Sequence, residues 1–320
     1  MTVPWVGVTA FLVTLVATPA VIVLARRTGI VDHPGALKPQ AVAVPYLGGL
    51  AVWAGTMVGV LAGRPGVAIP LTGALVLGVA DDRLDLAPGL RLVGQVAIGV
   101  AVGLAIPVHL PTVLAMPLIV AVSVLIINGV NLIDGLDLLA GGVAAVAAVG
   151  FAVALHGSGR QVAVALGAAS LAFLAFNRPP ARVYLGDGGS YLLGTALAVL
   201  LAYSWEPGVP TAIGMATLVL VAIPAAELAF AVVRRVRGRQ AITDGDRGHP
   251  YDRLVARGWP RLAASLAYIA VEIALATGAV VAVRLVSLPI ALVVDLVGGG
   301  ALVLAGVATG ALVPDPGARA

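Results

Sequence analysis

Asparagine and aspartate recur at three-residue intervals in one polar segment of an otherwise apolar chain. The segment reads Asn128-Gly-Val-Asn131-Leu-Ile-Asp134-Gly-Leu-Asp137. On a helix, steps of three keep side chains roughly on one face, so the spacing predicts a ridge of four oxygen-bearing groups. Such a ridge can bind a hard cation, or the hydroxyls and amide edges of a nucleotide.

Two adjacent carboxylates, Asp81 and Asp82, end another apolar run, with Asp85 close behind. Neighbouring carboxylates repel one another and are costly near hydrocarbon unless a cation or a proton offsets them. The pair therefore indicates Mg²⁺ or a proton relay. The alternative is a solvated cap of charges at the membrane interface.

A third polar segment, Gly186-Asp187-Gly-Gly-Ser190, stands where an apolar run begins. Free N–H groups at a helix start suit phosphate, and an aspartate beside them suits the accompanying metal ion. The structural alternative is that Asp187 or Ser190 caps the helix.

Rare residues give a further clue. Lys38 is the one lysine among nineteen basic residues, and the three asparagines are Asn128, Asn131 and Asn177. Lys38 is either a phosphate contact or an interfacial charge, and Asn177 is either functional or a helix cap. His249 lies in the arginine-rich stretch 234–261, where it could be a ligand, a donor to phosphate or an interfacial histidine.

The composition limits the elements that position these residues. The 320 residues are 60% hydrophobic and 11% charged, and the mean hydropathy is +1.07. These values exclude a single soluble domain, a disordered chain and a collagen-like chain. The absence of cysteine excludes disulfides and thiolate chemistry. The net charge of +4 reflects arginines flanking membrane spans, so no nucleic-acid partner is expected.

Runs long enough to cross a bilayer predict an all-α, polytopic membrane protein with about eleven transmembrane helices. We expect one transmembrane catalytic domain over residues 1–320, with cytoplasmic loops at about 25–41, 81–91, 128–137, 177–188 and 234–260. The predicted spans are 4–24, 42–62, 67–80, 91–107, 110–127, 138–155, 161–176, 189–204, 209–233, 261–283 and 286–312.

Arginine counts predict the orientation. Connections after the odd-numbered spans one to nine hold fifteen of the nineteen basic residues, and the other connections hold Arg64, Arg160 and Arg284. The positive-inside rule places the fifteen-residue side in the cytoplasm and the N-terminus outside. Most acids lie on the same side, which the rule does not explain and a cytoplasmic-face active site does.

Taken in order, these segments resemble the motifs of the polyprenyl-phosphate N-acetylhexosamine-1-phosphate transferases. That family includes the phospho-MurNAc-pentapeptide translocase and the bacterial GlcNAc-1-phosphate transferases. Asp81-Asp82 is similar to its paired-aspartate motif, 128–137 to its Asn-x-x-Asn-x-x-Asp-Gly-x-Asp motif, and 186–190 to its Gly-Asp-x-Gly-Ser motif. The family's first loop is matched by Asp32, Pro34, Lys38, Pro45, Gly48 and Gly49.

The chain departs from the family pattern at several positions. Gln40 stands where His is usual, Leu138 where Gly is common and Glu227 where Asp is usual. The family's His-x-His-His-Arg-Leu appears as His249-Pro-Tyr251-Asp252-Arg253-Leu254. These departures bear on the sugar-nucleotide preference more than on the reaction class.

The resemblance implies transfer of a sugar-1-phosphate from a UDP-sugar to a polyprenyl phosphate, releasing UMP, as the first membrane step of cell-wall or surface-glycan synthesis. It implies Mg²⁺, with Mn²⁺ as a substitute, on Asn131 and Asp187. Lys38, Asp81 and Asp82 would be catalytic: Lys38 would hold phosphate as a point charge, and Asp82 would deprotonate the lipid phosphate or orient it. The implied substrate-binding residues are Asn128, Asp134, Asp137, Gly186, Ser190, His249 and Arg253.

Other readings stay open. Glu227, Glu272 and Asp295 lie within apolar stretches, which is typical of secondary transporters. The altered histidine motif is compatible with a relative that binds lipid-linked sugar without catalysis. The expected partners are the UDP-sugar, the polyprenyl phosphate and membrane lipid, in the cell membrane, and a homodimer remains one option.

Overall fold

All eleven predicted spans form helices in the computed structural model, which describes residues 1–34, 42–241 and 248–314. The long helices are α1 (Val3–Thr28), α2 (Gly48–Ala62), α3 (Ala68–Leu84), α4 (Pro88–Ala105), α5 (Thr112–Ile133), α6 (Leu139–Ala154), α7 (Gly157–Asn177), α8 (Gly186–Tyr203), α10 (Ala222–Gly238), α12 (Arg261–Leu285) and α13 (Leu288–Thr309). The shorter elements are β1 (Val31–Asp32), β2 (Val44–Pro45), η1 (Pro65–Val67), α9 (Thr211–Leu218), η2 (Val219–Val221) and α11 (Pro250–Ala256).

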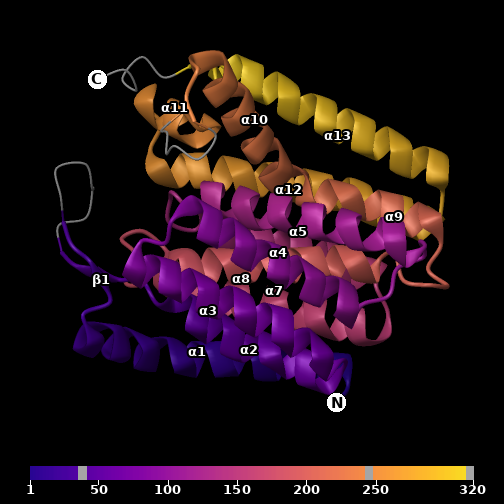
Figure 1. The fold of residues 1–320 in the computed structure, drawn as a ribbon, viewed down its shortest axis with the longest axis horizontal. Coiled ribbons are helices and arrows are strands. Elements are labelled where there is room, and N and C mark those ends of the chain that lie inside the picture. Colours follow the sequence, from indigo (N-terminus) through magenta and orange to yellow (C-terminus); the bar gives the residue numbers. More distant parts are fainter. Residues whose placement is uncertain (35–41, 242–247, 315–320) are drawn as a thin grey trace.

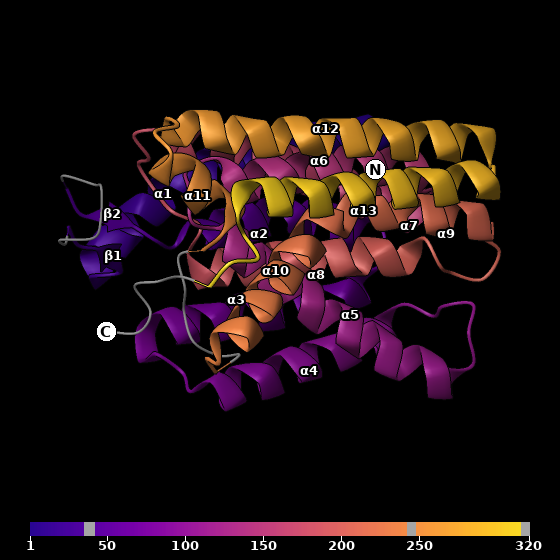
Figure 2. The same ribbon diagram turned by 90° about the horizontal axis from the view of Figure 1, so that it is seen from above.

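The chain reverses direction from one span to the next, so alternate connections meet at the same end of the bundle (Figure 1). We call the end that holds the connections after α1, α3, α5, α7 and α10 the motif end, and the other the opposite end. The N-terminus lies at the opposite end (Figure 1), and Figure 2 shows the helices in several layers with α12 and α13 along one side. Every polar segment singled out above is thus at the motif end.

Helix α8 lies at the centre of the bundle. Its residues from Gly188 to Tyr203 are all buried, and it packs mainly against α3 and α5. Small residues such as Gly188, Gly189 and Gly194 allow the helix backbones to approach closely. Close packing of this kind drives helix association in a membrane, where the hydrophobic effect does not. The helix start that carries Asp187 is therefore held by its neighbours.

The ninth span is broken. Its helix α9 ends at Leu218, the 3₁₀ turn η2 follows, and α10 begins at Ala222. Pro224 explains the break, because proline lacks an N–H group and its ring clashes with the carbonyl four residues earlier. The sequence predicts a span over 209–233, and Thr211–Gly238 forms one candidate membrane span that contains this irregularity.

The predicted ridge of four oxygen-bearing side chains is wrong in part. Helix α5 ends at Ile133, so Asn128 and Asn131 are helical, whereas Asp134 is the C-cap and Asp137 lies in the following turn. Two further differences are local. The span expected from residue 42 begins at Gly48, because Val44–Pro45 pairs antiparallel with Val31–Asp32. The connection after α10 contains the short helix α11.

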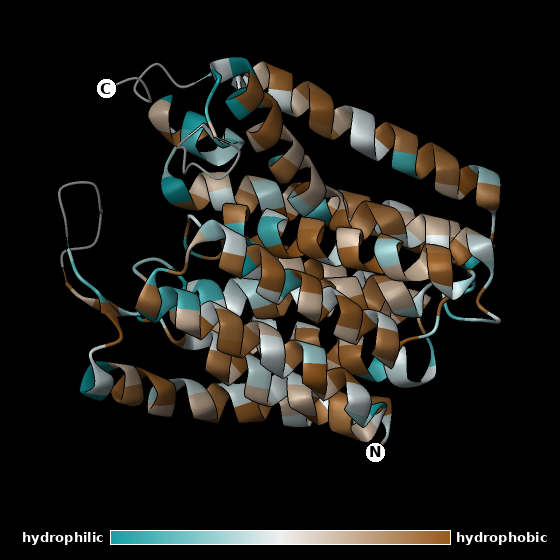
Figure 3. Ribbon diagram, in the orientation of Figure 1, coloured by the Kyte–Doolittle hydropathy of each residue, from teal (hydrophilic) through white to brown (hydrophobic). Residues whose placement is uncertain are grey.

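The apolar surface identifies a multi-pass membrane protein. Among the described residues, seven helices are long and apolar enough to cross a membrane, with α9 to α10 taken together, and α2 and α6 are shorter apolar helices. Many large apolar side chains on α4, α5 and α13 are exposed, including Leu104, Val113 and Leu296. Figure 3 shows apolar residues along the helices and polar residues mainly near their ends. The predicted all-α polytopic class is confirmed.

Candidate functional site

The connection between α7 and α8 joins the polar segments into one site at the motif end. The N–H of Gly48 donates to the Tyr184 carbonyl (2.9 Å), and the N–H of Ala181 donates to Asp137 Oδ2 (3.3 Å). The Tyr251 hydroxyl in turn donates to the Leu132 carbonyl (2.9 Å). Together with the contact of Asp82 described next, these bonds connect all five polar segments, which lie up to two hundred residues apart in the chain.

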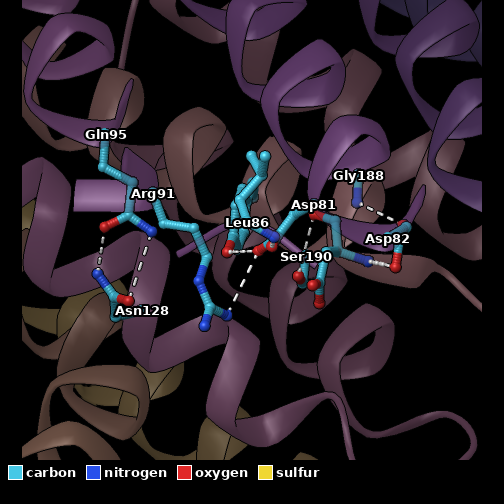
Figure 4. Close-up of polar contacts among 10 residues, drawn as sticks. Asp81, Asp82, Leu86, Arg91, Gln95, Asn128, Gly188 and Ser190 are labelled. Atoms are coloured by element: carbon cyan, nitrogen blue, oxygen red, sulfur yellow. Dashed lines mark hydrogen bonds and ion pairs between the residues drawn. The ribbon is translucent and has the colours of Figure 1, made fainter. Parts of the chain in front are cut away.

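The Asp82 side chain caps helix α8 from across the bundle (Figure 4). Its Oδ1 accepts from the N–H of Asp187 (3.1 Å) and its Oδ2 from the N–H of Gly188 (3.3 Å). Free N–H groups and the positive end of the helix dipole both favour a carboxylate at this place. Helix α8 has no cap from its own side chains, so the alternative in which Asp187 or Ser190 caps it is not observed.

The neighbouring Asp81 has different partners. Its carboxylate is buried and accepts from the Tyr191 hydroxyl (2.7 Å) and from the N–H of Leu86 (3.1 Å). Arg91 lies 3.5 Å from Asp81 Oδ2 (Figure 4). Both adjacent aspartates therefore contact α8, Asp82 at its first N–H groups and Asp81 at the Tyr191 side chain, and Asp81 also lies near Arg91 of α4.

Further along α4, Gln95 pairs with Asn128 of α5 (Figure 4). The Asn128 amide nitrogen donates to Gln95 Oε1 (2.7 Å) and to the Val124 carbonyl (2.8 Å). Gln95 is buried. In this structure Asn128 is thus bonded within the protein, and a substrate would contact it by exchanging one of these bonds.

Several carboxylates near the start of α8 act on one another through their charges. Burial, together with the charges of Asp82 and Asp81, raises the pKa of Asp187 to about 7. Burial also raises the pKa of Asp82 to about 6, although its two backbone hydrogen bonds lower it. Burial and the charges of Asp187, Asp82 and Asp137 raise the pKa of Asp134 well above its usual range. Acids that repel one another in this way favour a bound cation.

The donor set suits Mg²⁺ better than a metal held by protein alone. The described residues contain no group of three or more His, Cys, Asp or Glu side chains arranged to hold a metal ion. Mg²⁺ is usually held by one or two carboxylates together with substrate phosphates and water. Asp187 and Asn131, both half-buried, offer oxygen ligands of this kind.

Close backbone contacts fix the first turn of α8. A Cβ atom on Gly49 would lie 2.4 Å from the backbone of Gly189, so glycine at this position lets α2 and α8 approach closely. Gly186 has φ +71°, and a Cβ there would lie 2.3 Å from the Tyr46 carbonyl oxygen. The Ser190 hydroxyl is buried and donates to the Asp187 carbonyl (3.2 Å).

Asn177 holds two connections together. Its Oδ1 accepts from the N–H of Leu138 (2.8 Å), and its amide nitrogen donates to the Val183 carbonyl (3.0 Å). The side chain is buried. Asn177 therefore has a structural role, although it links two loops and does not cap its own helix.

His249 lies in a buried polar cluster beside the site. Its Nδ1 lies 2.9 Å from Glu227 Oε2, and the Tyr268 hydroxyl donates to Glu227 Oε1. The His249 ring stacks on Tyr251, with the ring centroids 5.4 Å apart. His249 is 3% exposed, so it belongs to the protein interior and is not an interfacial histidine.

Arg253 faces the C-terminal end of the described chain. Its Nη2 donates to the Val313 carbonyl (2.8 Å), and Arg257 donates to the carbonyls of Ala308 and Thr309 (3.1 and 2.9 Å). Arginines near a helix C-terminus satisfy its free carbonyls. Lys38 and Gln40 lie outside the described residues, so the structure does not place the predicted phosphate contact.

Three tyrosines contribute to the site although the sequence pattern gives none of them a role there. The Tyr191 hydroxyl donates to Asp81. The Tyr251 hydroxyl donates to a carbonyl of α5, and the Tyr268 hydroxyl donates to Glu227 of α10. A signal existed for Tyr191, which directly follows the Gly-Asp-Gly-Gly-Ser segment. The other two stand in or after an arginine-rich stretch, where a tyrosine reads as an interfacial residue.

Comparison with known proteins shows what the chain is similar to. The sequence pattern of glycosyl transferase family 4 matches residues 65–204, which include Asp81-Asp82 and the polar segments 128–137 and 186–190. The chain is similar to a probable undecaprenyl-phosphate N-acetylglucosaminyl 1-phosphate transferase of Bacillus subtilis, 29% identical over 274 residues (78% of this chain, 76% of the relative).

Two further relatives have similar names. The decaprenyl-phosphate N-acetylglucosaminephosphotransferase of Mycobacterium tuberculosis is 30% identical over 307 residues (79% of this chain, 76% of the relative). An undecaprenyl-phosphate alpha-N-acetylglucosaminyl 1-phosphate transferase of Thermotoga maritima is 29% identical over 234 residues (72% of this chain, 74% of the relative). The similarity thus extends over most of each protein.

Proposed function

Since the chain belongs to glycosyl transferase family 4, we propose that it transfers an N-acetylhexosamine-1-phosphate group from a UDP-sugar to a polyprenyl phosphate, releasing UMP. The relatives' names supply the acceptor class and the transferred group. The observation that carries the proposal is the carboxylate cluster at the start of α8, which five polar segments surround at one end of a membrane bundle.

The proposed reaction is a phosphoryl transfer. An oxygen of the lipid phosphate bonds to the phosphorus that carries the sugar, and the bond from that phosphorus to the bridging oxygen breaks. The sugar keeps its phosphate, and UMP leaves with the bridging oxygen. Such reactions depend mainly on positioning and on neutralising charge. A lipid phosphate at the membrane surface and a water-soluble polyanion can both reach a site at the end of a helical bundle.

Asp187 and Asn131 are the residues that we propose to hold Mg²⁺, or Mn²⁺ in its place. When bound, the ion would neutralise charge on the transferred phosphate. The mutual repulsion of Asp187, Asp134 and Asp82 supports a cation here. Lys38 would add a compact positive charge for phosphate.

We assign Asp82 a positioning role. Both of its oxygens accept N–H groups of α8, and breaking these bonds would free the helix start that carries Asp187. A phosphate monoester has a second pKa of about 6 and is mostly ionised at neutral pH, so a general base gains little. Asp81 accepts from Tyr191 and Leu86, so it would hold the end of α3 in position against α8 and thereby keep Asp82 at the start of α8.

The remaining residues would place the nucleotide and its diphosphate. Asp134 and Asp137 are half-buried at the site, and Gly186 keeps the backbone free of a side chain there. His249 would act from its buried cluster, where Glu227 orients the ring. The complete proposed set is Asn128, Asp134, Asp137, Gly186, Ser190, His249 and Arg253.

The orientation is part of the proposal. The arginine count favours the motif end in the cytoplasm and the N-terminus outside, and the acids gather at the same end. A UDP-sugar is a cytosolic donor, so it would reach the site directly from that side.

The test uses the purified full-length chain in detergent micelles with UDP-N-acetylglucosamine, undecaprenyl phosphate and Mg²⁺. We expect UMP to form only when both substrates and the metal ion are present, and chromatography measures it. Release of UDP in place of UMP would contradict the proposed bond cleavage. Tight binding of the UDP-sugar with no turnover for any UDP-N-acetylhexosamine would favour the non-catalytic alternative.

A further inference from the structure

The opposite end of the bundle contains a basic cavity that the transferase chemistry does not use. The cavity has a volume of about 390 Å³ and is lined by His156, Arg160 and Arg284 together with apolar residues that include Val153, Ile213 and Val283. Ligand-binding pockets fall in the range of roughly 300–1,000 Å³, so the cavity is large enough for a small ligand group.

The charge distribution makes this cavity unusual. Connections at the opposite end hold Arg64, Arg160 and Arg284 as their only basic residues, and Glu206 as their only acid. Arg64 forms an ion pair with Glu206 (2.7 Å). The two arginines that remain line the same cavity, and the described residues offer neither of them a carboxylate partner.

Helix dipoles explain one of these arginines but not the other. Arg284 is in the last turn of α12, where a cation is favourable. Arg160 is in the first turn of α7, where the positive end of the helix dipole disfavours a cation. Helix α7 also lacks a side-chain cap, so free N–H groups lie beside this arginine. An anion in the cavity would offset all of these positive groups.

The surroundings indicate what kind of anion fits. Most residues that line the cavity are apolar, and Leu285 and Leu288, which flank the lining residue Val286 in the chain, have exposed side chains. A free inorganic anion gains nothing from apolar walls, whereas a lipid presents a phosphate next to acyl chains. We propose that this cavity binds the phosphate headgroup of an anionic phospholipid in the leaflet at the opposite end.

This inference is independent of the proposed transfer reaction, because the cavity and the carboxylate cluster lie at opposite ends of the bundle. The test is native mass spectrometry of the purified full-length protein, titrated with phosphatidylglycerol or with zwitterionic phosphatidylcholine. We expect selective retention of phosphatidylglycerol. Equal retention of the two lipids would overturn the proposal.

Variants assign the binding to the cavity. A basic residue near an anionic lipid surface contributes about fivefold in affinity, so Arg160→Gln and Arg284→Gln should each weaken phosphatidylglycerol binding about fivefold, and the double variant by about 25-fold. Arg160→Lys should retain most of the binding. Arg64→Gln is the matched control, since it removes one charge from the same end outside the cavity, and it should change binding less than twofold.

Two results would contradict the assignment. Unchanged phosphatidylglycerol binding by the folded double variant, with thermal unfolding like that of the parent, would show that the lipid binds elsewhere. Full displacement of the lipid by millimolar inorganic phosphate would show that the cavity selects a free anion and not a headgroup. Failure of the double variant to fold leaves the single variants and Arg160→Lys to decide the question.

Discussion

At the scale of single residues, two neighbouring aspartates have separate tasks. The Asp82 carboxylate accepts from the first N–H groups of α8, and the Asp81 carboxylate accepts from the Tyr191 hydroxyl of the same helix. The sequence predicted that the pair, together with Asp187, belongs to one site. It could not predict which carboxylate faces the ligand, because that depends on where α8 begins relative to α3.

Asp187→Asn keeps the size of the side chain and removes its charge from the proposed metal site. We expect at least a hundredfold loss of turnover, which is about 2.7 kcal/mol of transition-state stabilisation. Asp85→Asn is the matched control, because Asp85 is exposed and has φ 47°, a conformation that asparagine tolerates. UMP formation by the two variants, measured side by side, checks this. If the turnover of Asp187→Asn is within threefold of that of Asp85→Asn, Asp187 is not a metal ligand.

Asp82→Asn tests the positioning role of this aspartate. An asparagine can accept one of the two N–H bonds, and its amide group repels the other N–H. Loss of a helix cap costs about 0.5–2 kcal/mol, so we expect a lower unfolding temperature together with reduced turnover. Thermal unfolding monitored by circular dichroism checks the first effect. Reduced turnover at an unchanged unfolding temperature would favour direct action of Asp82 on the substrate.

At the scale of the elements, hydropathy was sufficient to find every span but not its irregularities. Apolar side chains count equally in a straight and in an irregular helix, so hydropathy predicts the ninth span without locating the 3₁₀ turn η2 inside it. The end of α5 at Ile133 was missed for another reason. Three-residue spacing suits a helix, but Asp137 accepts from the N–H of Ala181 from its position in the turn after the helix.

Gly49→Ala tests the close packing of α2 on α8. The added methyl group would meet backbone atoms of Gly189 at 2.4 Å, so one helix must move away from the other. Overpacking of this kind costs about 1–3 kcal/mol, and the movement displaces the helix start that carries Asp187. We expect a lower unfolding temperature and at least a tenfold loss of turnover.

Gly89→Ala is the control for this change, since a Cβ atom at Gly89 meets nothing within 4 Å. It should leave both unfolding temperature and turnover close to those of the parent. A Gly49→Ala variant that behaves like Gly89→Ala would show that the first turn of α8 does not need this contact.

Glu272 on α12 carries a buried carboxylate for which the described residues provide no hydrogen-bond partner. Replacing a buried unpaired acid by an apolar side chain of similar length removes a desolvation cost. We expect Glu272→Leu to raise the unfolding temperature, with a gain of about 1–4 kcal/mol, and to leave turnover intact. Loss of turnover in a folded, stabilised variant would instead indicate a function for this intramembrane acid, as the transporter hypothesis requires.

At the scale of the whole molecule, the bundle has two chemically different ends. The motif end holds the carboxylate cluster and most of the arginines, and the opposite end holds the Arg64–Glu206 ion pair and the basic cavity. Arginine counting predicted this division from sequence, because charge bias depends on composition and not on tertiary contacts. The cavity itself lies between the ends of α6 and α12 and the starts of α7 and α9. No local sequence pattern predicts that these four helix termini lie together.

The orientation gives a further prediction. A reporter fused after Arg160 should be located outside the cell, and one fused after Gly238 should be cytosolic, because fifteen of nineteen basic residues lie on the second side. Alkaline phosphatase and green fluorescent protein fusions measure the two locations. The reverse pattern would place the carboxylate cluster away from cytosolic nucleotides.

The central claim is that the sugar is transferred together with its phosphate. The direct measurement uses a UDP-sugar labelled with ³²P at the phosphate that carries the sugar, incubated with the purified protein, undecaprenyl phosphate and Mg²⁺. We predict that the label enters the organic-soluble lipid product in equal amount to the UMP released. Label that stays in the aqueous phase as UDP while the sugar moves to the lipid would contradict the account.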